Sequence, residues 1–222
     1  VCSKLLGRLG CSVHGINLEP NGEFSHGPEP IPDNISELCR FVLEKSADIG
    51  FAVDPDVDRL SIVDEEGNAP GEEYTLAMAA EYLFEHGVNA AACNLSTSRM
   101  IDDAAERHGA KVYRAPVGEI NVVEKMLEVK AQIGGEGNGG VIYPALHPGR
   151  DAVLGIALIL QSMVDPGAVA SELIGNFHRY SMLKQKIAIP QDFDWAEAVK
   201  TAFNGAKMEL IDGIKATIDN SW

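Results

Sequence analysis

Helical and strand-like patterns alternate through the middle of the chain, and this alternation restricts the possible folds more than any other feature. The expected helices span residues 73–85, 99–108, 120–129, 151–163 and 168–179, and the expected strands lie at 90–95, 111–115, 132–134 and 141–143. A helix between two strands returns the chain to start the next strand in the same direction, so the pattern predicts a mostly parallel sheet. The predicted fold is a three-layer α/β domain.

Segments of different texture flank this region. The first contains an expected helix at 2–9, a strand at 12–17, a helix beginning at Asp33 or Asn34, and strands at 49–53 and 60–63; the last contains an expected strand at 183–189, a helix at 195–203 and a strand at 214–218. We therefore expect domains at 1–70, 71–179 and 180–222, the last being the start of an α+β domain. The chain begins without methionine inside an expected helix and stops just after an expected strand, so we interpret it as a fragment of a longer polypeptide.

The charge and composition exclude several classes of partner. Eighteen basic residues against 33 acidic ones give a formal charge of -15, which would repel a nucleic-acid backbone. No apolar run approaches the roughly 20 residues that a membrane span needs. The four cysteines lack metal-site spacing, which is typical of reduced thiols. We expect a cytoplasmic protein that binds neither nucleic acid nor membrane.

An acidic loop, Asp54-Pro55-Asp56-Val57-Asp58-Arg59, follows an apolar run that is expected to be a buried strand. Three carboxylates at alternate positions of a tight loop can converge on one hard cation, and Mg²⁺ prefers oxygen ligands of this kind. Arg59 adds a planar donor fork that suits a phosphate held on the same metal. The loop therefore predicts a magnesium site at Asp54, Asp56 and Asp58.

The acidic loop is compatible with three other interpretations. A solvated acidic turn would leave three like charges at the end of a buried strand, which is costly without a cation. A calcium-binding helix–loop–helix would need glycine where Arg59 stands, and helices where strands are expected. A phosphatase with Asp54 as nucleophile and Asp56 as acid is the stronger rival.

A glycine-rich loop at residues 134–140 contains five glycines with Glu136 and Asn138 between them. A carboxylate and an amide can together accept and donate hydrogen bonds to neighbouring hydroxyls of a sugar. A phosphate-binding P-loop would need Lys-Ser or Lys-Thr directly after the glycines, and neither pair follows this loop. On its own, this loop is more typical of a flexible turn than of a site.

Two further segments follow expected strands of the sheet. Ser96, Thr97 and Ser98 stand where one strand ends and a helix begins, and Gly118 and Glu119 occupy the same place after the next strand. Ligands in open α/β sheets bind at the carboxyl ends of the strands, so we expect these loops to share one rim with Glu136. The alternative role for the hydroxyl residues is simple helix capping.

Taken in this order, the motifs resemble those of the α-D-phosphohexomutase superfamily, which includes phosphoglucomutase, phosphomannomutase and phosphoglucosamine mutase. The resemblance extends to the segments 47–52, 71–76, 149–152 and 211–215. The family's usual aspartate motif has glycine where Pro55 stands, and its sugar loop commonly has serine at Asn138 and often histidine at Gly140. These departures leave the three carboxylates and the arginine in place.

The resemblance implies a four-domain enzyme of which this chain covers most of the second domain, all of the third and the start of the fourth. The first two of these segments are then three-layer α/β/α domains, the first of them partial. The first domain and the rest of the fourth would be missing partners.

By the same resemblance, the aspartates hold Mg²⁺ together with a phosphoserine outside this chain. Arg59 then stabilises the transferred phosphoryl group, and Glu136 with Asn138 grips the sugar of a hexose 1- or 6-phosphate, with a hexose 1,6-bisphosphate as intermediate.

Three functions therefore stand side by side. The mutase is favoured because several motifs occur in the right order. An aspartyl-nucleophile phosphatase is the enzymatic alternative, and a non-catalytic metal or sugar-phosphate binding module is the third. The resemblance also implies that this chain alone lacks mutase activity, because the phosphoryl donor lies outside it.

Overall fold

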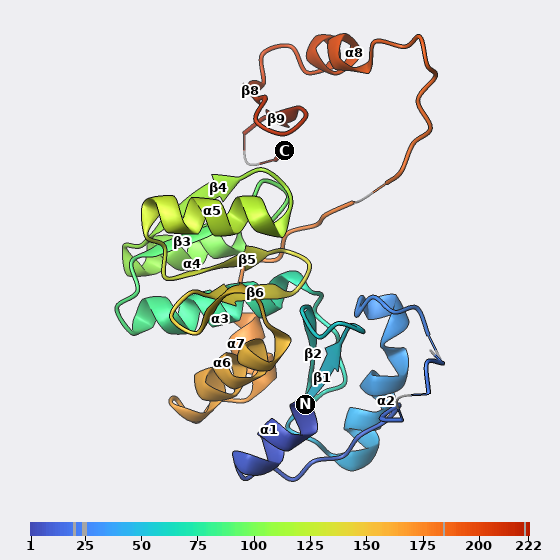
Figure 1. The fold of residues 1–222 in the computed structure, drawn as a ribbon, viewed down its shortest axis with the longest axis vertical. Coiled ribbons are helices and arrows are strands. Elements are labelled where there is room, and N and C mark those ends of the chain that lie inside the picture. The colour runs from blue at the N-terminus through green and yellow to red at the C-terminus, as the bar shows by residue number, and fades with distance from the viewer. Residues whose placement is uncertain (20, 24–25, 184, 220) are drawn as a thin grey trace.

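The computed structural model describes residues 1–19, 21–23, 26–183, 185–219 and 221–222. Figure 1 shows a central sheet with its helices, an N-terminal part built around a two-stranded hairpin, and a small C-terminal part reached through a long extended segment. No helix in these described ranges is long and apolar enough to cross a bilayer.

The central sheet has five strands in the order β4-β3-β5-β6-β7. The strands are β3 (Ala90–Asn94), β4 (Lys111–Ala115), β5 (Ile133–Glu136), β6 (Gly140–Tyr143) and β7 (His147–Arg150). Strand β3 runs parallel to β4 and β5, whereas β5–β6 and β6–β7 pair antiparallel. The prediction of a mostly parallel sheet is therefore wrong, because two of the four strand pairings are antiparallel. The connections after β5 and β6 are too short for a parallel crossover.

Helices cover both faces of this sheet, as expected for a three-layer fold. They are α3 (Glu73–Glu85), α4 (Met100–His108), α5 (Glu119–Val129), α6 (Ala152–Val164) and α7 (Ala170–Gly175). Side chains alternate along β3, so Ala91 and Cys93 pack into the core with α3 and α4, while Ala90 and Ala92 pack against α5. Small residues at these positions let the helices approach the strand closely.

The N-terminal part is a hairpin of β1 (Ile49–Val53) and β2 (Leu60–Asp64) with helices on both sides. Helix α2 (Ser36–Lys45) packs on one side, where Val42 meets Val63. Helix α1 (Cys2–Arg8) and the central helix α6 lie on the other side, around the fully buried Leu60. Because α6 packs against both the hairpin and the central sheet, it joins these two parts.

The C-terminal part contains α8 (Trp195–Ala202) and an antiparallel pair, β8 (Lys207–Glu209) with β9 (Lys215–Thr217). The helix and the second strand were expected, whereas β8 was not.

Several expected elements are wrong. Residues 12–17 form no strand because no neighbouring segment pairs with them, and the described residues of 183–189 are likewise unpaired, residue 184 lying outside the description. The helix expected at 168–179 is the shorter α7. Residues Pro32–Asn34 form a short 3₁₀ turn, so α2 begins after Ile35 rather than at Asp33 or Asn34. Strand β7 was missed because its sequence, His-Pro-Gly-Arg, has no strand pattern, although an edge strand tolerates proline.

Candidate functional site

The acidic turn between β1 and β2, residues 54–59, is called the aspartate loop below. Each of its three aspartates offers an oxygen within 4.8 Å of the others. The turn is closed by Asp54, whose Oδ1 accepts hydrogen bonds from the backbone N–H of Asp58 at 3.1 Å and of Arg59 at 3.0 Å. Val57 adopts the left-handed region with φ of 62°. The sequence prediction that the three carboxylates converge is therefore met by the geometry.

Arginine side chains lie beside these carboxylates. Arg59 Nε donates to Asp54 Oδ2 at 2.5 Å, and Asp58 Oδ2 forms an ion pair with Arg150 Nη2. Burial raises the pKa of Asp54, but hydrogen bonds from Arg59 and Asp58 outweigh this effect and hold its pKa below the usual value. Burial, followed by the neighbouring Asp54, raises the pKa of Asp58 to about 6 against the opposing charge of Arg150.

The donor set fits a hard divalent cation. Asp58 Oδ1 is buried and finds no hydrogen-bond donor among the described residues, although it lies 3.7 Å from Arg59 Nε on the side of Asp54. Asp56 is exposed, so the loop opens to solvent on one side. Three carboxylates and an open side are what Mg²⁺ requires, since it keeps some water or phosphate ligands.

The glycine-rich loop comprises the last three residues of β5, a tight turn at residues 137–139 and the first residue of β6. Both oxygens of its carboxylate accept hydrogen bonds. Glu136 is 4% exposed. Its Oε1 accepts from Asn94 Nδ2 at 2.7 Å and from the Gly118 N–H at 3.1 Å, and its Oε2 accepts from Arg150 Nη1 at 2.7 Å. Asn138 is only half-buried, and its Oδ1 accepts from the Gly140 N–H at 3.2 Å. Of the two residues predicted to hold a sugar, Asn138 is the more accessible.

The backbones of the aspartate loop and the glycine-rich loop are joined directly. The Leu60 N–H donates to the Gly139 carbonyl at 3.0 Å, which continues β2 onto the turn. Gly139 has φ of 91°, and a Cβ there would stand 2.3 Å from the Leu60 carbonyl oxygen. Glycine is therefore required at this position for the two loops to meet.

The serine loop, residues 96–98, follows β3 on the same rim. Thr97 Oγ1 and Ser96 Oγ donate to Asn94 Oδ1 at 2.8 and 3.0 Å, and Thr97 Oγ1 accepts from the Gly137 N–H at 3.0 Å. Arg114 on β4 holds this loop from behind by donating to three backbone carbonyls, those of residues 94, 97 and 98. Thr97 and Ser98 are buried, so only the Ser96 hydroxyl reaches the surface of the rim.

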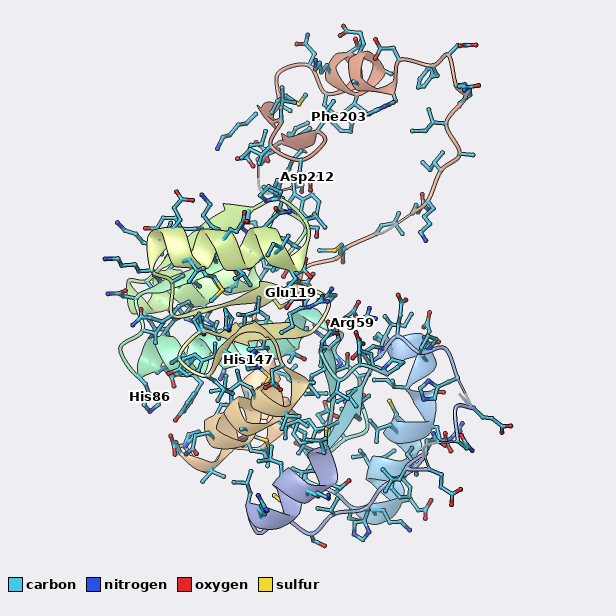
Figure 2. All side chains as sticks on the ribbon, viewed as in Figure 1. Arg59, His86, Glu119, His147, Phe203 and Asp212 are labelled. Carbon is cyan, nitrogen blue, oxygen red and sulfur yellow. The ribbon has the colours of Figure 1, made fainter. Side chains whose placement is uncertain are left out.

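Gly118 and Glu119 also lie on this rim, at the start of α5. Gly118 has φ of 115° and aims its N–H at Glu136. Glu119 Oε1 accepts the Arg150 N–H at 2.8 Å. Figure 2 labels Glu119 and Arg59 where the central sheet meets the hairpin. All the residues predicted for the site are thus brought to one region.

Sequence reasoning missed two residues of this region, Asn94 and Arg150. Asn94 is 3% exposed and links the serine loop to Glu136. A polar residue at the carboxyl end of an apolar strand could have pointed to it. Arg150 belongs to the Gly-Arg-Asp-Ala segment, but nothing in that pattern indicates that its side chain contacts both loops.

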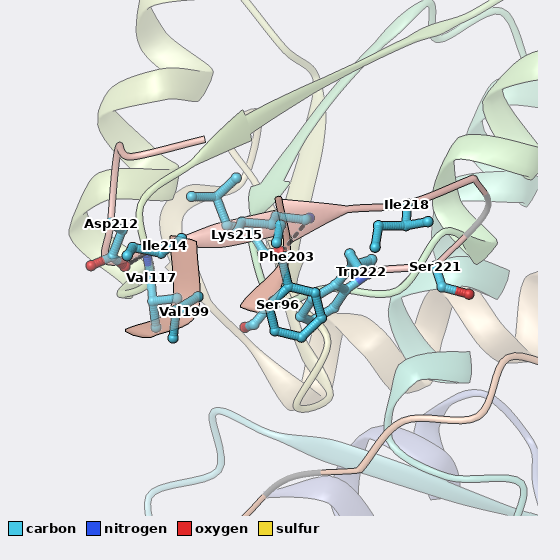
Figure 3. Close-up of a pocket in the computed structure, with 12 residues that line it drawn as sticks. Ser96, Val117, Val199, Phe203, Asp212, Ile214, Lys215, Ile218, Ser221 and Trp222 are labelled. Atoms are coloured by element: carbon cyan, nitrogen blue, oxygen red, sulfur yellow. Dashed lines mark hydrogen bonds between the residues drawn. The ribbon is translucent and has the colours of Figure 1, made fainter. Parts of the chain in front are cut away.

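The C-terminal part closes over one end of the rim, and Figure 3 shows the pocket of about 440 Å³ that lies between them. Asp212 accepts the Val117 N–H at 2.7 Å, and Lys215 Nζ donates to the Leu95 carbonyl at 2.8 Å. Burial, followed by the charge of Arg114, lowers the pKa of Lys215. Ser96 also lines this pocket, which is otherwise mostly apolar.

Comparisons with known proteins place this geometry in a family. The profile described as "Phosphoglucomutase/phosphomannomutase, alpha/beta/alpha domain II" matches residues 1–67, and the profile of domain III matches residues 71–180. A "Phosphoglucomutase/phosphomannomutase" of Thermococcus kodakarensis is 37% identical over 98% of this chain and 49% of its own length. A "Probable phosphoglucosamine mutase" of Methanopyrus kandleri is 31% identical over 100% of this chain and 50% of its own length.

Solved structures agree with the fold. A phosphoglucomutase/phosphomannomutase family protein from Burkholderia thailandensis superposes with a TM-score of 0.79 and 22% identity, over 97% of this chain and 48% of that protein. The chain spans about half the length of the curated relatives it matches. With both domain profiles in sequence order and the fold in agreement, the chain belongs to the phosphoglucomutase/phosphomannomutase family.

Proposed function

We propose that this chain carries the metal site and the sugar site of a phosphohexomutase that interconverts hexose 1-phosphates and 6-phosphates. The observation that carries this proposal is the convergence of the three aspartates beside the glycine-rich loop, to which they are joined by the Leu60–Gly139 hydrogen bond. A phosphoryl transfer between two positions of one sugar needs a bound cation close to the residues that bind the sugar.

Asp54, Asp56 and Asp58 would hold Mg²⁺, which when bound neutralises charge on the phosphoryl group. Arg59 would stabilise the transferred phosphoryl group beside the cation. Its Nε holds Asp54, and its Nη1 lies 3.7 Å from Glu29 Oε1, which is beyond a hydrogen bond. The outer edge of the guanidinium is therefore suited to a phosphate oxygen.

The sugar would lie against Asn138, Glu136 and Ser96 on the rim. Asn138 and Ser96 are partly exposed and would contact hydroxyls first. Thr97 and Gly118 would shape the site through their bonds to the glycine-rich loop, and Glu119 through its bond to Arg150. Ser98, whose N–H donates to Glu73 and whose carbonyl accepts from Arg114, would hold the serine loop in place. Glu136 would reach hydroxyls only by exchanging one of its present hydrogen bonds, since both of its oxygens are occupied.

The whole protein would supply what the reaction still needs. We infer a division into domains at 1–70, 71–179 and 180–222, with the phosphoserine on a preceding domain and the remaining phosphate-binding part after residue 222. Hexose 1,6-bisphosphate would be the reaction intermediate. The protein would act in the cytoplasm. The chain alone would then be inactive as a mutase.

The phosphatase alternative loses support from the surroundings of Asp54. This residue is 2% exposed, and both of its oxygens accept hydrogen bonds from Arg59 or Asp58. A carboxylate in that setting is held for structure or for metal binding and is poorly placed to attack phosphorus.

The test is to trap the phosphoenzyme of the full-length protein after incubation with a hexose 1,6-bisphosphate and Mg²⁺. Acid-stable phosphoserine supports the mutase. A hydroxylamine-sensitive acyl phosphate would support the phosphatase, and no phosphoenzyme at all would leave a binding module. Turnover of glucose, mannose and glucosamine 1-phosphates by the same protein then identifies the substrate.

A further inference from the structure

Arg150 lies between the aspartate loop and the glycine-rich loop and contacts carboxylates from three different elements. Its Nη2 pairs with Asp58 Oδ2, its Nη1 lies 2.7 Å from Glu136 Oε2, and its Nε lies 3.4 Å from Glu119 Oε2. The Arg150 side chain is only 17% exposed. One positive charge is thus shared among three negative ones in a largely buried place.

The position of this guanidinium depends on a neighbouring glycine. A Cβ at Gly140 would stand 2.3 Å from Arg150 Cδ, so the aliphatic stem of the arginine passes directly over the Gly140 backbone. The backbone of Arg150 is fixed as well, because its N–H donates to Glu119 and the next residue, Asp151, caps α6 by accepting from the N–H groups of residues 153 and 154. The arginine is therefore held at both its base and its tip.

The two oxygens of the Asp58 carboxylate lie beside different partners. Oδ2 is taken by Arg150, whereas Oδ1 lies on the side of Asp54 and Arg59. A cation bound by the aspartates would therefore share Asp58 with Arg150. A sugar bound at Glu136 would share that carboxylate with the same guanidinium.

We propose that Arg150 is a positioning residue that couples the metal site to the sugar-phosphate site by holding Asp58 and Glu136 at once. Its charge opposes a divalent cation at the aspartates, and the same charge orients Glu136 and favours an anionic sugar phosphate. The sugar half of this proposal rests on the proposed function, whereas the metal half rests on the aspartate loop alone.

Removal of this arginine should change the two affinities in opposite directions. In Arg150→Gln, Mg²⁺ should bind about tenfold more tightly because a nearby positive charge is lost, and sugar phosphate should bind about tenfold more weakly. A variant that merely damaged the local structure would weaken both. Arg150→Lys keeps the charge but not the fork, so Mg²⁺ affinity should stay within about twofold while sugar phosphate still binds more weakly.

Two further variants complete the design. Gly140→Ala pushes the arginine stem aside without changing any charge, and it should weaken sugar-phosphate binding by about threefold with a smaller change for Mg²⁺. Arg107→Gln removes an arginine that pairs with Glu81 on the surface of α3 and α4, and it should change neither affinity.

The experiment is calorimetric titration of the full-length protein and these variants, first with Mg²⁺ and then, at saturating Mg²⁺, with glucose, mannose or glucosamine 1-phosphate. Thermal unfolding without Mg²⁺ gives an independent readout, because Arg150→Gln should lower Tm and gain more from added Mg²⁺ than the parent does. Opposite shifts in the two affinities support the proposal. Unchanged or weaker Mg²⁺ binding in a folded Arg150→Gln protein would overturn it. Failure of the unaltered protein to bind any of the sugar phosphates would instead overturn the proposed function.

Discussion

The aspartate loop can be compared with a second group of possible metal ligands on helices α3 and α4. This helix cluster consists of Glu81, Glu85 and His108, and its ligand atoms also lie within 4.8 Å of one another. In the helix cluster, Glu81 is already engaged by the Arg107 guanidinium and by His108 Nε2 at 2.6 Å, while the other two members are exposed.

The difference lies in how the carboxylates are held. The aspartates sit on one backbone turn whose own N–H groups bind Asp54, and that turn is hydrogen-bonded to the neighbouring loop. The helix cluster depends on long side chains from two helices, which must lose rotamer freedom to converge. Similar distances between possible ligand atoms therefore do not make the two groups equivalent. Of these two groups, the aspartate loop alone has a buried carboxylate oxygen, Asp58 Oδ1, that finds no hydrogen-bond donor within the described part of the chain.

The largest expected effect comes from Asp56→Asn in the aspartate loop. Loss of one of three anionic ligands should weaken Mg²⁺ binding by more than about a hundredfold, since even outer partners of metal ligands are worth 10–100-fold. Mutase activity of the full-length protein should disappear, while Tm holds or rises because repulsion is relieved. Glu85→Gln in the helix cluster is the matched control, and equal losses in both variants would remove the distinction between the two groups.

A pair of glycine substitutions tests whether the backbone holds one group and not the other. Gly139→Ala meets the Leu60 carbonyl and should cost about 2–4 kcal/mol of unfolding free energy. Gly109, directly after His108, has φ of 67°, and a Cβ there would lie in open space. Gly109→Ala should therefore cost only about 1 kcal/mol of unfolding free energy. Denaturant titration measures both. Equal costs would mean that the contact between the loops contributes nothing.

Glu136→Gln sharpens the comparison from the sugar side. It keeps the shape of the residue but weakens its bonds to Arg150, Asn94 and Gly118, and bonds to a charged group contribute about 1.5–3 kcal/mol. Catalytic efficiency of the full-length protein should fall accordingly, with Mg²⁺ affinity changing by less than about threefold. A metal defect as large as that of Asp56→Asn would mean that Glu136 belongs to the metal site instead.

The smallest effect is expected from Glu81→Gln in the helix cluster. Its ion pairs with Arg107 and His108 are on the surface, where such pairs contribute about 0–1 kcal/mol. The free energy of unfolding should therefore change by less than about 1 kcal/mol, and Mg²⁺ affinity should stay the same. Reduced Mg²⁺ binding here would show that the helix cluster holds the metal.

Sequence reasoning located the loops but not the contacts between them. The aspartates, Ser96 and Glu119 could be placed because each follows an expected strand, and the carboxyl ends of neighbouring strands share an edge. The reach of Arg150 could not be predicted, because it comes from an edge strand without a strand pattern and depends on the open space over Gly140. The hydrogen bonds that occupy both oxygens of Glu136 could not be predicted either, because most of their donors are distant in sequence.

We propose above that the aspartate loop is the cation site of this protein. The most direct measurement is an anomalous difference map from crystals of the protein grown with Mn²⁺, which replaces Mg²⁺ and scatters anomalously. We expect one peak among Asp54, Asp56 and Asp58, and none at the helix cluster. A peak at Glu81, Glu85 and His108, or no peak at the aspartates, would contradict it.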